Sequence, residues 1–123
     1  MAHMLNWFEI PVRDIHRACT FYGAIFNADI QPTEFAGFTM AYLPGQDGDV
    51  TGGLIQHEMY TPSHHAGPLL YLNGGDDLQA VLDRVEGAGG QILSPKREIA
   101  PEVGYMALFI DSEGNRMALH SMG

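Results

Sequence analysis

The 123-residue sequence predicts an α+β fold made of two βαβββ modules in a single domain. Two amphipathic helical patterns lie 63 residues apart, with Ile15 in the first corresponding to Leu78 in the second. One strand-like segment precedes each helical pattern and three follow it. The same offset carries His57 onto His120, and each histidine ends an apolar strand. This agreement indicates a duplicated module.

The first module spans about residues 4–58 and opens with a strand at 5–12, LNWFEIPV. Asp14 then provides the short acceptor side chain that is typical of a helix N-cap. Apolar residues follow at helical spacing, at Ile15, Ala18, Cys19, Tyr22, Ile25 and Phe26. Three further strands are expected at 29–35, 37–43 and 52–57.

The second module spans about residues 68–122 and opens with a strand at 68–73. Its helix is expected to begin at Asp77 and to stop at Gly89–Gly90. The remaining strands are expected at 91–99, 104–110 and 116–120, and a polar linker at about 58–67 joins the modules. One module alone would bury too little surface to be stable. We therefore expect the modules to pair, either within one chain or between chains.

The composition limits the classes of partner. The net charge is −9, from 15 acidic and 6 basic residues, which argues against binding to nucleic acid or to an anionic membrane. No apolar run approaches the roughly 18 residues of a membrane span, and the first residues do not read as a signal peptide. The single cysteine, Cys19, cannot form an internal disulfide, which fits a reducing compartment. The expected location is the cytoplasm.

Two segments carry a resemblance to a known superfamily. FEIPVRDIHRACTFYGAIFNADI, at residues 8–30, contains an Asp-Ile…Phe-Tyr helix, and YMALFIDSEGNRMALHS, at 105–121, contains an Asp-x-x-Gly-Asn turn. Together with the element order, they resemble the glyoxalase/bleomycin-resistance/extradiol-dioxygenase superfamily, also called the vicinal oxygen chelate superfamily. The resemblance implies sheets that curl into a cup, usually in a homodimer. It also implies that the cup holds either a divalent metal or a ligand pocket.

The metal positions that the resemblance implies carry unsuitable side chains. Counting from Asp14 and from the Asp-x-x-Gly-Asn turn places the four positions at Trp7, Ile55, Leu69 or Leu70, and Ala118. None of these side chains offers the nitrogen or oxygen donor that a divalent ion needs. No cofactor is therefore predicted. A divalent metal remains the alternative, because a one-residue slip in register would exchange the faces of a strand.

A polar layer is expected beside these positions, because residues two apart along a strand share a face. It contains Glu9, His57 and His120, and also Tyr71 if the third position is Leu69. Histidine titrates near neutral pH, so Glu9, His57 and His120 are the candidate catalytic residues for proton transfer on a small ligand. A displaced metal site and a purely structural role at the strand ends are the other interpretations. Whether these side chains converge is open.

Three functions remain open at this point. The first is a small-molecule-binding protein that lacks the usual metal, with a pocket lined by Trp7, Ile55, Tyr71, Ala118, Tyr42 and Tyr105. The second is a metal-dependent lyase, isomerase or dioxygenase of the kind that the resemblance implies. The third is a structural or accessory domain. A homodimer is expected, and the identity of the ligand cannot be inferred, because one scaffold serves unrelated chemistries.

Overall fold

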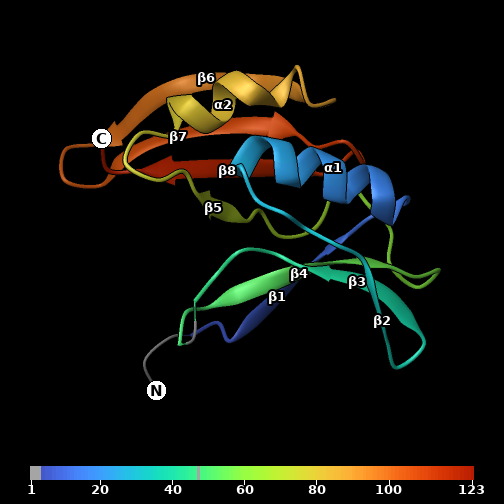
Figure 1. Cartoon of the computed structure of the whole chain (residues 1–123). Helices are drawn as coiled ribbons and strands as arrows, with labels where there is room; N and C mark the ends of the chain where they lie inside the picture. Colours follow the sequence, from blue (N-terminus) through green and yellow to red (C-terminus); the bar gives the residue numbers. More distant parts are fainter. Residues whose placement is uncertain (1–3, 47) are drawn as a thin grey trace.

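The computed structural model describes residues 4–46 and 48–123, and its elements follow the predicted order. The first module contains β1 (Trp7–Pro11), α1 (Ile15–Phe26), β2 (Thr33–Phe35), β3 (Phe38–Tyr42) and β4 (Thr51–Gln56). The second module contains β5 (Tyr71–Asn73), α2 (Gln79–Val85), β6 (Gln91–Ala100), β7 (Gly104–Ile110) and β8 (Arg116–Ser121). The predicted α+β fold of two βαβββ modules is confirmed (Figure 1).

Each module forms its own mixed sheet of four strands. The first sheet has the order β1-β4-β3-β2 and the second has the equivalent order β5-β8-β7-β6. In both sheets the first strand runs parallel to the last, and the other neighbours are antiparallel. The helix of each module provides the crossover that a parallel pair requires.

The helix ends follow local side-chain chemistry. Asp14 caps α1 as predicted, because its carboxylate accepts hydrogen bonds from the backbone N–H groups of His16 and Arg17. At the other end Asn27 adopts the left-handed conformation, with φ 52° and ψ 48°. The second helix begins at Gln79, two residues after the expected start, and Asp77 instead accepts a hydrogen bond from the Gln79 N–H in the preceding turn. No helix in the described ranges is long and apolar enough to cross a membrane.

The core lies between the two sheets and around both helices. Helix α1 packs against α2 and against β3 and β4, and the ring of Phe21 reaches β7, where its centroid lies 6.1 Å from that of Phe109. Ile10 and Leu54 of the first sheet and Leu119 of the second belong to this same buried cluster. We call the sheet faces that contribute to it the inner faces. Helix α1 therefore holds the modules together by occupying the space between them (Figure 1).

The opposite, outer face of each sheet carries no helix in the described structure (Figure 1). Met40 and Ile55 lie on the outer face of the first sheet, and Met106 and Ala118 lie on that of the second. All four are buried by their neighbours within the sheet, yet none belongs to the shared core. The two outer faces point away from the common core. Within one chain they consequently do not enclose a single cup.

Candidate functional site

An aromatic surface covers the outer face of the first sheet. The rings of Trp7 on β1 and Tyr42 on β3 meet edge to face, with centroids 6.0 Å apart. A Cβ atom at Gly53 would lie 3.2 Å from the Trp7 ring, tighter than most contacts, so the absence of a side chain there leaves room for the indole. Trp7 remains 36% exposed and Tyr42 55% exposed. Exposed aromatic rings of this kind are typical of binding surfaces.

A second aromatic group lies further along the same face. The ring of His57 lies 4.5 Å from that of Phe38, and Tyr60 lies 6.2 Å from both rings. His57 Nδ1 accepts a hydrogen bond of 3.1 Å from the Met59 N–H. Because a backbone N–H can only donate, the proton of neutral His57 lies on Nε2. This free ring nitrogen is therefore a hydrogen-bond donor.

Glu9 lies between these two aromatic groups. Its carboxylate accepts a hydrogen bond of 3.4 Å from Trp7 Nε1. A hydrogen bond to Glu9 and the negative charge of that carboxylate raise the pKa of the Tyr60 hydroxyl above its ordinary value. The carboxylate is thus placed by neutral partners in the middle of the aromatic surface.

The outer face of the second sheet contains the remaining histidine of the predicted polar layer. Tyr71 pairs with Ala118 in register, and Asn73 pairs with His120. Tyr71, Asn73 and His120 line an open depression of about 520 Å³. His120 Nε2 donates a 2.7 Å hydrogen bond to the Val103 carbonyl, which leaves Nδ1 free as an acceptor.

Gly104 is required for this arrangement of His120. Its φ of +102° is a conformation that L side chains rarely adopt. A Cβ atom there would lie 2.5 Å from the Ser121 carbonyl oxygen and 3.0 Å from His120 Nε2. The glycine consequently permits both the turn before β7 and the position of the imidazole.

The predicted site residues fall into three groups in the structure. Trp7, Glu9, Tyr42, Ile55 and His57 lie on the outer face of the first sheet, and Tyr71, Ala118 and His120 lie on that of the second. Tyr105 lies on the inner face of the second sheet, where it packs against the core and not against the other candidates. The structure therefore divides the predicted set between two separate outer faces and the inner face of the second sheet.

The positions expected to form one metal layer are also separated along the strands. Trp7 is opposite Thr51, whereas Ile55 is opposite Pro11, four residues further along β1. Among the described residues, no group of three or more His, Cys, Asp or Glu side chains is arranged to hold a metal ion. Glu9, His57 and His120 accordingly do not converge within one chain. Within one chain, the described side chains at these positions therefore form no donor set for the divalent metal that the resemblance implies.

A larger hollow lies at the seam between the modules and was not predicted from the sequence. Its volume is about 710 Å³, and its walls include Leu5, Phe8 and Leu43 from the first module and Leu70 and Leu72 from the second. The sequence offered only isolated apolar residues near strand ends as a signal. These apolar residues come together only through the position of one sheet relative to the other.

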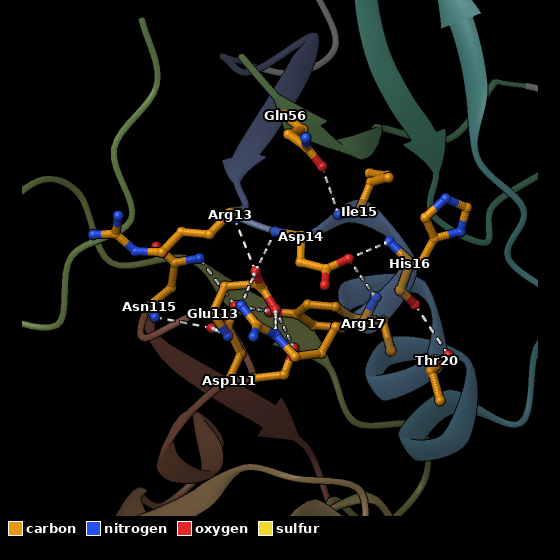
Figure 2. A network of polar contacts seen from close by, with 12 residues as sticks. Arg13, Asp14, Ile15, His16, Arg17, Thr20, Gln56, Asp111, Glu113 and Asn115 are labelled. Atoms are coloured by element: carbon orange, nitrogen blue, oxygen red, sulfur yellow. Dashed lines mark hydrogen bonds and ion pairs between the residues drawn. The ribbon is translucent and has the colours of Figure 1, made fainter. Parts of the chain in front are cut away.

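The Asp111–Asn115 turn joins the second module to the start of α1 (Figure 2). The Glu113 side chain is 0% exposed, and its Oε1 accepts 2.8 Å hydrogen bonds from the backbone N–H groups of Arg13 and Asp14. Arg17 binds both carboxylate oxygens, at 2.7 and 2.9 Å. Burial alone would raise the pKa of Glu113, but the hydrogen bonds from Arg17 and the backbone outweigh it and lower the pKa. The ionised form is the one that this turn stabilises.

Asp111 anchors the same turn from inside the core. Its carboxylate accepts hydrogen bonds from the hydroxyl of buried Tyr22, at 2.7 Å, and from Asn115 Nδ2, at 3.0 Å. Burial raises the pKa of Asp111 despite the opposing hydrogen bonds. Asn115 Nδ2 also donates to the Pro11 carbonyl at the end of β1. The network therefore fixes the position of one module relative to the other.

Three comparisons place these features among known proteins. A model of the Glyoxalase/Bleomycin resistance protein/Dioxygenase superfamily matches residues 4–119. A glyoxylase-like domain-containing protein of Didymella fabae is 31% identical over 123 residues, covering 94% of this chain and 91% of the relative. The anthracycline biosynthesis protein DnrV of Streptomyces peucetius is 26% identical over 130 residues. That alignment covers 95% of this chain but only 46% of the relative, so the chain spans about half of that protein.

Solved structures share the fold at low sequence identity. A glyoxalase/bleomycin resistance protein/dioxygenase family enzyme from Burkholderia phytofirmans has a TM-score of 0.70 and 21% identity, over 96% of this chain and 98% of the other. A glyoxalase/bleomycin resistance protein from Albidiferax ferrireducens has a TM-score of 0.72 and 16% identity, over 95% and 98%. A glyoxalase I mutant from Zea mays has a TM-score of 0.72 and 15% identity, over 94% of this chain and 44% of that chain. These likenesses concern the fold alone.

Proposed function

Because the chain belongs to the glyoxalase/bleomycin resistance protein/dioxygenase superfamily, we propose that it binds a small molecule on the outer faces of its sheets without a resident metal. The observation that carries this proposal is the exposed aromatic surface around Trp7 and Tyr42, which no helix covers. Aromatic and apolar walls with a few polar groups are the usual composition of small-molecule sites. The name of the Streptomyces peucetius relative associates that protein with anthracycline biosynthesis.

The site is completed in this proposal by a second copy of the chain. Tyr42 on one outer face is 55% exposed, and Tyr71 on the other is 53% exposed. A two-fold axis would set the first sheet of each chain against the second sheet of its partner, because a symmetric dimer uses each surface twice. A ligand would then lie between two faces that a single chain keeps apart.

Light scattering on the purified protein is expected to give twice the mass of one chain. Replacing Tyr71 by lysine places a charge on an exposed position of the outer face, so Tyr71→Lys should shift the mass towards the monomer. Ala24→Lys, on an exposed position of α1, is the matched control and should leave the dimer intact. A monomeric native protein, or a dimer that is insensitive to Tyr71→Lys, would contradict this assembly.

Proton transfer is a second candidate activity for the same site. His57 has a free Nε2 and His120 a free Nδ1, because a backbone group occupies the other ring nitrogen in each case. With these tautomers fixed, His57 Nε2 can donate a proton and His120 Nδ1 can accept one. In the proposed dimer the two histidines would approach from different chains, with Glu9 beside His57. The activity would be of a lyase or isomerase type that uses these side chains.

A thermal-shift screen of chelator-treated protein against a broad metabolite panel tests the binding proposal. We expect at least one compound to raise the melting temperature, and Trp7→Ala to lower the affinity for that compound about tenfold or more and so to reduce the shift, since a buried aromatic contact contributes roughly 1.5 kcal/mol or more. His57→Ala and His120→Ala should lower turnover of a converted ligand more than they lower its affinity. A response that appears only after a divalent metal is restored would refute the metal-free proposal.

A further inference from the structure

We infer that the ligand carries a cationic, ammonium-type group that binds against Glu9 and the rings of Trp7 and Tyr42. This inference rests on the proposed function and names the chemical class of its ligand. It comes from the way one carboxylate is placed beside exposed aromatic rings on the outer face of the first sheet.

The aromatic part of the argument is geometric. The rings of Trp7 and Tyr42 meet at an interplanar angle of 69°, so together they form two walls of a corner. Tyr60 and Phe38 form a second pair of walls, with centroids 6.2 Å apart and an interplanar angle of 73°. Ring faces carry partial negative charge and attract organic cations, most strongly when several rings surround the same position.

Glu9 forms no ion pair with a basic side chain in the described part of the chain. The side chain is exposed, its hydrogen-bond donor is the neutral Trp7 indole, and its charge influences the nearby Tyr60 hydroxyl. In the described part of the chain the ion pairs join Arg17 to Glu113 and Lys96 to Asp77, and neither involves Glu9. A carboxylate that is oriented by neutral donors but is not paired with a cation offers its charge to a ligand.

The net charge of the chain also favours a cationic ligand. A net charge of −9 attracts cations and repels anions before contact. The basic side chains of Arg97 and Arg116 follow the alternation of Met106 and Ala118 and so belong to the outer face of the second sheet. The first sheet therefore presents the acidic and aromatic half of the proposed site.

The emission of Trp7 reports directly on this corner, because the chain contains one tryptophan. Titrations at constant ionic strength would use three water-soluble probes that share a phenyl ring: benzyltrimethylammonium, benzyl alcohol and phenylacetate. We expect the cation to alter Trp7 emission with an affinity about tenfold higher than the neutral alcohol, and phenylacetate to bind more weakly than both.

Two variants separate charge from shape. Glu9→Gln retains an acceptor for Trp7 Nε1 and removes the charge, so the preference for the cation should disappear while benzyl alcohol binds as before. Glu58→Gln removes another exposed carboxylate and should leave the preference unchanged. Tyr42→Leu should reduce cation binding about fivefold by removing one ring face.

Several outcomes would overturn the inference while the proposed function stands. Equal binding of the cation and the alcohol would show that only the aromatic surface matters. If no probe binds but a panel compound does, the ligand binds elsewhere than at this corner. If Glu9→Gln weakens the dimer and leaves cation binding unchanged, the carboxylate pairs with a basic side chain of the second copy instead. Failure of the whole metabolite panel, by contrast, would refute the proposed function itself.

Discussion

Replacing Glu113 by alanine is expected to lower the free energy of unfolding by about 3 kcal/mol. The side chain is fully buried and satisfies two backbone N–H groups in front of α1 as well as the Arg17 guanidinium. Truncation leaves those two donors without their acceptor and breaks the contact between the second module and the first. The loss therefore exceeds that expected for a surface ion pair.

Chemical denaturation monitored by circular dichroism measures this effect. Glu113→Gln keeps one acceptor oxygen for the backbone donors, so it should cost less than Glu113→Ala. Glu58→Ala, on an exposed loop position, should change the free energy of unfolding by less than about 0.5 kcal/mol. If Glu113→Ala behaves like Glu58→Ala, the turn does not fix the modules as the hydrogen bonds indicate.

The role of Glu113 illustrates what local sequence patterns do not contain. The Asp-x-x-Gly-Asn turn was identified as a mark of the fold, yet the residue at its centre was not among the candidates. Its backbone partners, Arg13 and Asp14, lie 100 and 99 residues earlier in the chain. No periodicity within a short window reports such a contact. A buried charged residue in a turn becomes recognisable only when the chain is folded.

Secondary structure was predictable because it depends on short-range patterns. The N-cap of Asp14 was correctly derived from its residue type, and five of the six apolar positions predicted for α1 are buried. The sixth, Phe26, is only partly buried, and the helical spacing did not identify the fully buried Phe21. The second helix ends at Val85, before the predicted stop at Gly89–Gly90. It also begins later than expected because Asp77 and Leu78 form the turn before it, where Ser121 Oγ accepts a hydrogen bond from the Leu78 N–H. That interaction joins residues 43 apart, so tertiary contact set this helix boundary.

The candidate site was predictable within each strand but not between strands. Alternation correctly placed Trp7 with Glu9 on one face, since side chains repeat every second residue. It did not give the pairing of β1 with β4, in which Trp7 is opposite Thr51 and not Ile55. The directions of the outer faces depend on α1, which packs between the sheets. Tyr105 likewise has the right residue type but lies on the inner face.

Replacing Phe21 by alanine is expected to lower the free energy of unfolding by about 3–5 kcal/mol. Its ring is fully buried, lies 5.0 Å from that of Tyr22 and 6.1 Å from that of Phe109, and thus connects α1 to the second sheet. Truncation would leave a cavity in the layer that holds the modules together. The shift of the denaturation midpoint measures the loss in the free energy of unfolding, provided that the dependence of this free energy on denaturant concentration is unchanged.

Met40→Ala is the matched control for Phe21→Ala, because Met40 is also buried, with 6% exposed, but lies outside the shared core. Its loss should be about 1–2 kcal/mol, since solvent reaches an outer face more readily than a closed cavity. Met40→Ala should also weaken ligand binding, whereas the fraction of Phe21→Ala protein that remains folded should bind the ligand normally. Equal stability losses would mean that the outer face is as much a part of the core as the inner one. A larger stability loss in Phe21→Ala, together with weaker ligand binding in Met40→Ala alone, would locate stability between the sheets and binding on their outer faces.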